Sequence, residues 1–324
     1  MAQITKTIYD GSKGERLMRD VFASTIRDLL LEDKDVLYLD ADLMNSFGTQ
    51  KLQKEMSDCC IDCGIMEANM MGVAGGMSAV GKKPYAHTFG PFASRRCFDQ
   101  VFLSVGYAKN SVRIIGSDPG VTAAFNGGTH MPFEDIALYR VIPDALIVDV
   151  ADDVQFEHFL RATKDRPGVT YLRTPRKDMV KVYDPSETFE EGKAKVLKDG
   201  SDVALVAAGI MVSVALEAAA QLEKEGISAA VIDVVSIKPL DCNTVVEYAQ
   251  KCGAVVTAEN ANVLGGLGAA VAECLAENAP TPMQRIGAQD RYGEVGPEDY
   301  LRKTFGLEPT DVAAAAKRAI GLKK

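Results

Sequence analysis

The run Cys63–Gly81, CGIMEANMMGVAGGMSAVG, organises the first part of the chain. It predicts a buried helix that begins near Glu67. The expected apolar stripe of this helix recurs at alternating spacings of four and three residues: Met66, Met70, Val73, Met77 and Val80. Glu67 is the only charged residue of the run. It shares a helical face with Met70, Met71 and Ala74, so we expect its carboxylate to face apolar surroundings.

Two interpretations of Glu67 are open on this run alone. A glutamate in the first turn of a helix can simply complement the helix dipole. A carboxylic acid held in a dry cleft can instead exchange a proton with a ligand nitrogen, because burial disfavours its charged form. The glycines Gly72, Gly75 and Gly76 leave room for another backbone to approach this helix closely.

The composition is that of a soluble globular protein with about two domains. The chain has 324 residues, of which 47% are apolar and 25% charged. Its net charge of −9 argues against nucleic acid or an anionic membrane as the main partner. No apolar run is long enough to cross a bilayer, and the polar N-terminus has no signal-peptide pattern. We therefore expect a cytoplasmic protein.

The seven cysteines predict reduced thiols rather than a disulfide framework. Cys59, Cys60 and Cys63 lie close together in the sequence, but no second Cys/His cluster completes a set of four ligands. We expect no metal site formed by this chain alone.

Short apolar runs alternate with helical patterns, which predicts an α/β fold of two domains, each a mostly parallel sheet flanked by helices. In the first domain the expected strands are 35–43, 60–65, 83–89, 111–117, 145–150 and 169–173. In the second domain they are 202–208, 229–235 and 254–259. The charged stretch between them predicts a linker, so we place the domains at 1–176 and 196–324 and the linker at 177–195.

Three further segments are candidates for function. The first strand ends in Asp40 and Asp42, and open α/β sheets bind ligands at the carboxyl ends of their strands, although these residues could also cap the next segment. The glycine-rich loop 118–135, which contains His130, has a length that is often functional in compact domains. The GGLG at Gly265–Gly268 predicts a helix N-terminus that could hold an anion, or else close helix packing.

Several runs, taken in order, are similar to the transketolase family. They are MEANMMGVAGGMSAVGKKPYAHTFGPFASRRCFDQV at 66–101, GGTHMPFEDIALYRVIPD at 127–144 and YLRTPR at 171–176. The second half agrees through SIKPLD at 236–241, ENANVLGGLGAAVAE at 259–273 and FGL at 305–307. The resemblance covers almost the whole chain. It implies a pyrimidine-binding domain followed by a transketolase C-terminal domain.

The resemblance implies thiamine diphosphate as the cofactor. Glu67 matches the family glutamate that hydrogen-bonds N1′ of the aminopyrimidine and so promotes removal of the proton from C2 of the thiazolium. Phe89 and Phe92 match aromatic positions around the aminopyrimidine, and Asp42 matches an aspartate near the thiazolium. His130 matches a histidine that contacts the bound ketose intermediate. The resemblance thus favours a functional role for Glu67.

The resemblance also implies a site for a sugar phosphate. Arg19, Ser46 and Arg173 match the family positions that grip the phosphate, a task suited to the arginine fork. Each arginine taken alone could equally form a surface ion pair.

Three positions depart from the family pattern. Asp118 stands where a phosphate-contacting histidine is usual, and Arg95 replaces an aromatic residue that lines the pyrimidine pocket. Asn126, a candidate substrate-binding residue, stands where an aspartate reads an acceptor hydroxyl. These departures predict an unusual acceptor, such as a differently phosphorylated, branched or unphosphorylated sugar.

The family holds the cofactor diphosphate through a metal bound by a GDG…N segment, and this sequence contains no GDG. The resemblance therefore implies one subunit of a split transketolase, which transfers a two-carbon ketol unit from a ketose phosphate to an aldose. An N-terminal partner subunit would carry the diphosphate and Mg²⁺ or Ca²⁺, in an α2β2 assembly.

Other functions fit the same residues less well. A deoxyxylulose-phosphate synthase fragment and the β subunit of a 2-oxoacid dehydrogenase use the same cofactor, but the runs TFGPFASRR and GGTHMPFED look more like transketolase. A non-catalytic partner-binding half belongs to a different class. The presence of Glu67, Phe89, Phe92 and His130 together argues against a decayed site.

Overall fold

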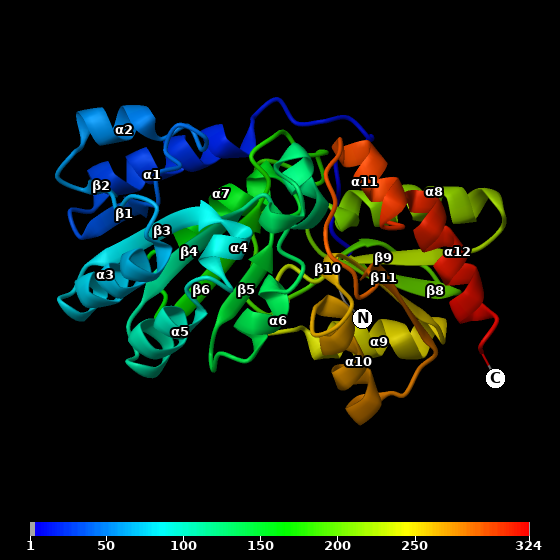
Figure 1. Cartoon of the computed structure of the whole chain (residues 1–324). Helices are drawn as coiled ribbons and strands as arrows, with labels where there is room; N and C mark the ends of the chain where they lie inside the picture. The colour runs from blue at the N-terminus through cyan, green and yellow to red at the C-terminus, as the bar shows by residue number, and fades with distance from the viewer. Residues whose placement is uncertain (1–3, 324) are drawn as a thin grey trace.

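The computed structural model describes residues 4–323, which form two α/β domains side by side (Figure 1). The first domain contains a six-stranded sheet in the order β2-β1-β3-β4-β6-β5, in which every neighbouring pair is parallel. Its strands are β1 (Val36–Asp40), β2 (Cys60–Asp62), β3 (Lys83–Phe89), β4 (Val112–Ser117), β5 (Leu146–Asp149) and β6 (Val169–Thr174). The predicted α/β class is confirmed.

Helices cover both faces of this sheet. They are α1 (Met18–Glu32), α2 (Gln50–Glu55), α3 (Glu67–Ala79), α4 (Gly90–Ala93), α5 (Phe98–Gln100) with the π-helix η1 (Val101–Tyr107), α6 (Asp135–Arg140) and α7 (Asp153–Ala162). Successive strand residues point to opposite faces. Tyr38 therefore joins the apolar core under α1 and α7, whereas Leu39 joins the core under α3 and η1.

The helix α3 forms as expected, but its apolar stripe does not. Met70 is buried, whereas Met66 and Val80 are 58% and 74% exposed, so the predicted stripe was wrong at both ends. The buried face is instead the one that Glu67 shares with Met70, Met71 and Ala74. This face packs on the sheet because residues spaced by three, four and seven positions lie on one side of a helix.

Only one of the three glycines expected to admit a neighbouring backbone does so. A Cβ atom on Gly75 would lie 2.8 Å from the carbonyl oxygen of Ser104, so the close packing of α3 on η1 requires glycine there. A Cβ atom on Gly72 or Gly76 would meet nothing within 4 Å.

The second domain contains a five-stranded sheet in the order β11-β10-β8-β9-β7, parallel except for the antiparallel edge strand β7. Its strands are β7 (Lys195–Lys198), β8 (Val203–Ala207), β9 (Ala229–Asp233), β10 (Val255–Asn262) and β11 (Met283–Ala288). Its helices are α8 (Met211–Lys224), α9 (Cys242–Cys252), α10 (Leu267–Asn278), α11 (Glu298–Thr304) and α12 (Pro309–Ile320). No helix within residues 4–323 has both the length and the apolar content to cross a membrane.

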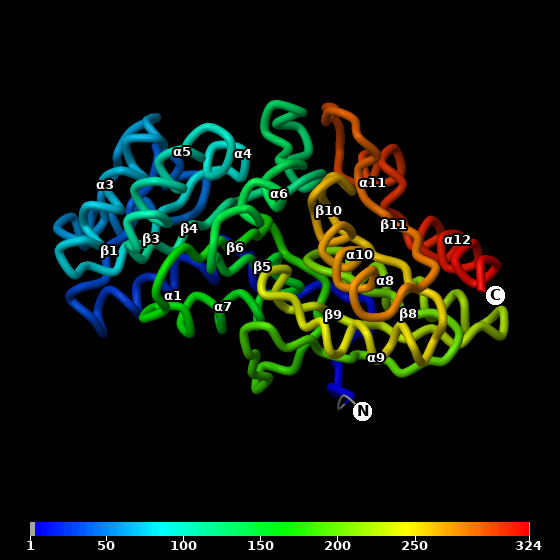
Figure 2. The backbone as a smooth tube through the Cα atoms, turned by 90° about the horizontal axis from the view of Figure 1, so that it is seen from below, coloured from blue at the N-terminus to red at the C-terminus, as the bar shows by residue number. Residues whose placement is uncertain are grey.

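The segment between the two sheets packs along the beginning of the chain. Isolated bridges join Lys13 to Val180 and Thr7 to Tyr183, and a further bridge joins Ile4 to Val196 of β7. The N-terminal segment thus runs from the first domain toward the second (Figure 2).

The domains also meet through the edge strand β5. The amide of Ile147 donates to the carbonyl of Lys238 at 2.9 Å, and the amide of Gly209 donates to the carbonyl of Asp149 at 3.0 Å. A Cβ atom on Gly209 would lie 2.5 Å from the Asp149 carboxyl group, so this contact requires glycine.

Candidate functional site

A cavity of about 360 Å³ lies at the carboxyl edge of the first sheet. The strands β1, β3, β4 and β6 are adjacent and parallel, so their carboxyl ends meet at this edge, where open α/β sheets bind ligands. Polar residues on the cavity wall include Arg19, Ser46, Asp118, Asn126, Arg176 and Lys177. Three of the expected substrate-binding residues, Arg19, Ser46 and Asn126, are thus brought together here.

The guanidinium of Arg176 is held from three sides. Its Nε lies 2.5 Å from Oδ2 of Asp118, and its Nη1 donates to Oγ of Ser46 at 2.5 Å. Its Cζ atom lies 4.9 Å from the centre of the Phe89 ring. The arginine is therefore fixed in place before any ligand arrives.

Asp118 is an almost fully buried carboxylate in the wall of this cavity, with 2% of its surface exposed. Burial raises the pKa of Asp118, while the positive charge of Arg176 acts in the opposite direction. Oδ1 accepts a hydrogen bond from the backbone amide of Arg176 at 3.1 Å. Oδ2 is in ion-pair contact with Arg176, but no N–H or O–H of the described residues points at it as a hydrogen-bond donor.

Glu67 lies at the start of α3 and is 3% exposed. Nη1 of Arg96 donates to Oε1 of Glu67 at 2.7 Å. The same guanidinium stacks over Phe92, with Cζ 3.8 Å from the ring centre. Arg96 itself is half-exposed, so the buried carboxylate is paired with a cation that reaches it from the solvent side.

His130 connects the two groups of residues. Its ring lies 5.1 Å from the ring of Phe92 and 5.6 Å from the ring of Phe89. Burial lowers the pKa of His130, and the nearby charges of Arg96, Arg176 and Arg95 lower it further. Contacts therefore run without a break from Glu67, through the aromatic rings, to Arg176 and the cavity.

The structure does not bring Asp42 or Arg173 to the cavity wall. Asp42 is exposed in the turn after β1, where its amide donates to Asp62 at 3.0 Å. The buried aspartate of this strand end is Asp40, which binds Nδ1 of His87 at 2.7 Å. His87 is fully buried and serves to join strand ends rather than to face the cavity.

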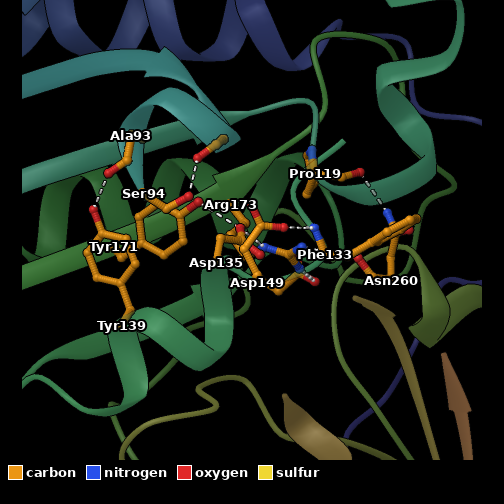
Figure 3. A network of polar contacts seen from close by, with 12 residues as sticks. Ala93, Ser94, Pro119, Phe133, Asp135, Tyr139, Asp149, Tyr171, Arg173 and Asn260 are labelled. Atoms are coloured by element: carbon orange, nitrogen blue, oxygen red, sulfur yellow. Dashed lines mark hydrogen bonds and ion pairs between the residues drawn. The ribbon is translucent and has the colours of Figure 1, made fainter. Parts of the chain in front are cut away.

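Arg173 lies in the buried network shown in Figure 3. Its Nε lies 2.7 Å from Oδ2 of Asp135, its Nη1 2.5 Å from Oδ2 of Asp149, and its Nη2 donates to the carbonyl of Asn260 at 3.1 Å. Burial raises the pKa of Asp149 to about 6, although Arg173 counteracts it. With no exposed surface, Arg173 supports the fold at this point and does not contact the cavity.

Through the same network the second domain positions the loop 118–135. The side chain of Asn260 donates to the carbonyl of Pro119 at 2.8 Å and accepts from the amide of Val121 at 3.0 Å. These contacts fix the start of the loop next to Asp118, which has a left-handed φ of 55°. The second domain therefore shapes the cavity although it contributes none of the wall residues named here.

Arg176 and Arg96 were not predicted from the sequence as site residues. Arg176 is the second arginine of the run 171–176, and it follows the end of β6, whereas Arg173 lies inside that fully buried strand. Its position beyond the strand end is the sequence feature that could have indicated Arg176. Arg96 follows Phe92 by four residues, but only the tertiary fold reveals its pairing with Glu67.

The departure at Arg95 has a local explanation. Its guanidinium turns away to Glu134, at 2.5 Å, and to the carbonyl of Thr129, at 3.0 Å. It therefore holds the loop that carries His130 instead of lining an aromatic pocket.

The GGLG segment does not present a free helix N-terminus. Glu259 of β10 already occupies it, accepting hydrogen bonds from the amides of Leu267 at 2.7 Å and Gly268 at 2.8 Å. Burial raises the pKa of this carboxyl to about 7. The anion expected there is a side chain of the protein itself.

Comparisons with known proteins give the family. The pyrimidine-binding domain of transketolases matches residues 15–181, and the transketolase C-terminal domain matches residues 192–312. A 6-deoxy-6-sulfo-D-fructose transketolase subunit of Clostridium sp. (strain MSTE9) is 44% identical, over 93% of this chain and 94% of its own length. An apulose-4-phosphate transketolase subunit of Phocaeicola vulgatus is 33% identical, over 92% of this chain and 96% of its own length.

Two solved structures are also similar to this chain. A split-gene transketolase, solved as an inactive β4 tetramer, superposes with a TM-score of 0.87 at 39% identity, covering 96% of this chain and all of the other. A transketolase mutant from Pichia stipitis, at 19% identity, shares the fold with a TM-score of 0.80 and is covered over 48% of its length. The chain therefore belongs to the transketolase family and comprises its pyrimidine-binding and C-terminal domains.

Proposed function

We propose that this chain is one subunit of a thiamine diphosphate-dependent transketolase, and that it transfers a two-carbon ketol unit from a ketose phosphate to an aldose once a partner subunit completes the site. The observation that carries the proposal is the buried carboxylate of Glu67 beside the ring of Phe92. The family depends on thiamine diphosphate, so the question is whether these residues suit that cofactor.

The residues fit an aminopyrimidine ring. The planar guanidinium of Arg96 already makes the two contacts that such a ring needs, since it stacks on Phe92 and donates to Glu67. Phe89 lies beside Phe92, with 6.3 Å between ring centres. When bound, thiamine diphosphate supplies the carbanion chemistry of the reaction. Asp42, which is exposed in its turn, is the residue that we assign to the thiazolium.

In this proposal each residue has one task. Glu67 holds a proton at the pyrimidine nitrogen, from its buried place at the start of α3. His130, whose pKa is lowered, is a neutral imidazole at neutral pH and can donate or accept a hydrogen bond with the ketose. Arg19, Ser46 and Asn126 bind the sugar chain and its far end, together with Arg176, which takes the place expected of Arg173.

A partner subunit would carry the diphosphate and Mg²⁺ or Ca²⁺. Within residues 4–323 there is no group of three or more His, Cys, Asp or Glu side chains that could hold a metal ion. Large apolar side chains are exposed near the site, among them Ile65, Met66 and Phe125. A partner in an α2β2 assembly would cover them.

The experiment that tests the proposal replaces Glu67 by Gln in the enzyme reconstituted with an N-terminal transketolase subunit, with xylulose 5-phosphate as the donor. We expect turnover to fall by at least about 10²-fold, because Gln cannot hold the proton. Turnover near the wild-type value would refute the proposal. Release of carbon dioxide from pyruvate or another 2-oxoacid would favour the deoxyxylulose-phosphate synthase or dehydrogenase alternative instead.

A further inference from the structure

The cavity wall contains an ion pair of opposite charges, whereas binding a phosphate requires only the positive partner. Arg176 is the arginine fixed in its wall, and its partner Asp118 is a carboxylate with 2% exposure. Oδ2 of Asp118 is buried and receives no hydrogen bond from the described residues. Its contact is the ion pair with Nε of Arg176, and a buried carboxylate in a cavity wall adds its negative charge to the field that a ligand meets there.

The pair changes the charge that a ligand meets. The buried carboxylate of Asp118 offsets the charge of the partly exposed Arg176 at contact distance. The other two cations on the wall, Arg19 and Lys177, are exposed to solvent, where screening weakens their attraction. An anionic group at this wall therefore meets the fixed guanidinium of Arg176, the hydroxyl of Ser46 and the weaker attraction of exposed Arg19 and Lys177. It also meets a fixed negative charge, that of Asp118, beside Arg176.

We propose that Asp118 is a specificity-determining residue that makes this cavity select a ketose whose far end is a singly charged oxyanion, of the sulfonate class, over a doubly charged phosphate ester. The inference rests on the proposed ketol-transfer function and names the substrate class of that site.

The two groups share a tetrahedral anionic head, although the sulfonate lacks the bridging oxygen of the phosphate ester, and they differ chiefly in charge. Both present three oxygens on a tetrahedral centre, and both can accept hydrogen bonds from Arg176 and Ser46. A sulfonate carries one charge at any ordinary pH, whereas a phosphate monoester carries about −1.5 to −2 at pH 7 because its second pKa is near 6. The second charge is disfavoured beside the Asp118 carboxylate, roughly 10- to 100-fold after allowance for screening.

The test measures kcat/KM of the reconstituted enzyme for a ketohexose 6-phosphate, the corresponding 6-deoxy-6-sulfonate and the uncharged ketohexose. For the wild-type enzyme we expect the sulfonate to be favoured over the phosphate by about 10-fold or more at pH 7.5. Asp118→Asn keeps the shape and removes the charge, so it should lower this ratio about 10-fold, chiefly through a lower KM for the phosphate. The control Asp178→Asn removes a carboxylate that pairs with exposed Lys13, outside the cavity, and should leave the ratio unchanged.

A pH series gives a second measurement that needs no variant. As the pH falls from 7.5 to 5.5 the phosphate loses its second charge, so its kcat/KM should rise relative to that of the sulfonate. A phosphate preference that Asp118→Asn leaves unchanged, a ratio independent of pH, or a preference for the uncharged ketohexose would each overturn the inference while leaving ketol transfer intact. Failure to turn over any of the three ketoses would overturn the proposed function and this inference with it.

Discussion

Replacing Arg96 by Met tests whether the charge of Glu67 depends on this one partner. The substitution keeps an unbranched apolar stem over Phe92 and removes the guanidinium that donates to Glu67 at 2.7 Å. Breaking a fully buried ion pair costs about 3–5 kcal/mol, because one charge is left unpaired. Glu67 is buried but Arg96 is half-exposed, and solvent at Arg96 can replace part of the interaction, so we expect a loss of about 1–3 kcal/mol.

The assay is urea and thermal unfolding of the chain, followed in wild type, Arg96→Met, Glu67→Gln and the double variant. A loss of about 1 kcal/mol lowers the midpoint by about 3 °C for a domain of this size. The double-mutant cycle should give a coupling of about 1–2 kcal/mol, since Gln needs no counter-charge. The matched control is Arg95→Met, whose guanidinium pairs with half-exposed Glu134 and should contribute less than about 1 kcal/mol.

Two results would refute the dependence of Glu67 on Arg96. One is a cost of Arg96→Met that is as large in the Glu67→Gln background as in wild type. The other is a cost of Arg96→Met that is no larger than that of Arg95→Met. In either case the carboxylate of Glu67 would be stabilised by something other than the guanidinium over Phe92.

Three further predictions concern the network, the second domain and the site. Arg173→Met should lower the free energy of unfolding by about 3–5 kcal/mol in urea titrations, because it leaves Asp135 and Asp149 buried without their cation; near-wild-type stability would contradict the network. Burial raises the pKa of Glu259 to about 7 from 4.5, so its contribution to stability is complete below pH 4.5 and is lost as the pH rises through 7. The thermal unfolding midpoint of Glu259→Gln should therefore vary less between pH 5 and 8 than that of wild type. His130→Asn should cut kcat of the reconstituted enzyme by about 10²- to 10⁴-fold and leave the thermal midpoint almost unchanged, and an unaltered kcat would remove His130 from the proposed site.

The sequence was sufficient for the fold class and for the face of Glu67. Helical spacing alone places Glu67 with Met70, Met71 and Ala74, and the sheet confirms that this face is buried. The same spacing was misleading for Met66 and Val80, because a run that is apolar all round fits more than one stripe. Only the position of the sheet decides which side of such a helix is covered.

Contacts between segments that lie far apart in the sequence could not be predicted from it. A run with two arginines does not tell which one is buried in a strand and which one follows the strand end. The resemblance therefore predicts Arg173, whereas Arg176 lies on the cavity wall. The carboxylate of Glu259 in β10 accepts hydrogen bonds from the amides at the start of α10, a contact that depends on how the strand and the helix pack. The contact of Asn260 with the loop 118–135 spans 141 residues, and no local pattern signals it.

The most direct test of the central proposal is a calorimetric titration of thiamine diphosphate with Mg²⁺ into this chain alone and into its complex with an N-terminal transketolase subunit. We expect no saturable binding to the chain alone, and tight binding to the complex that Glu67→Ala weakens at least about 10-fold, since the carboxylate supplies one of the charge-assisted contacts to the pyrimidine. Tight binding to the chain alone, or binding to the complex that is indifferent to Glu67→Ala, would contradict the proposal.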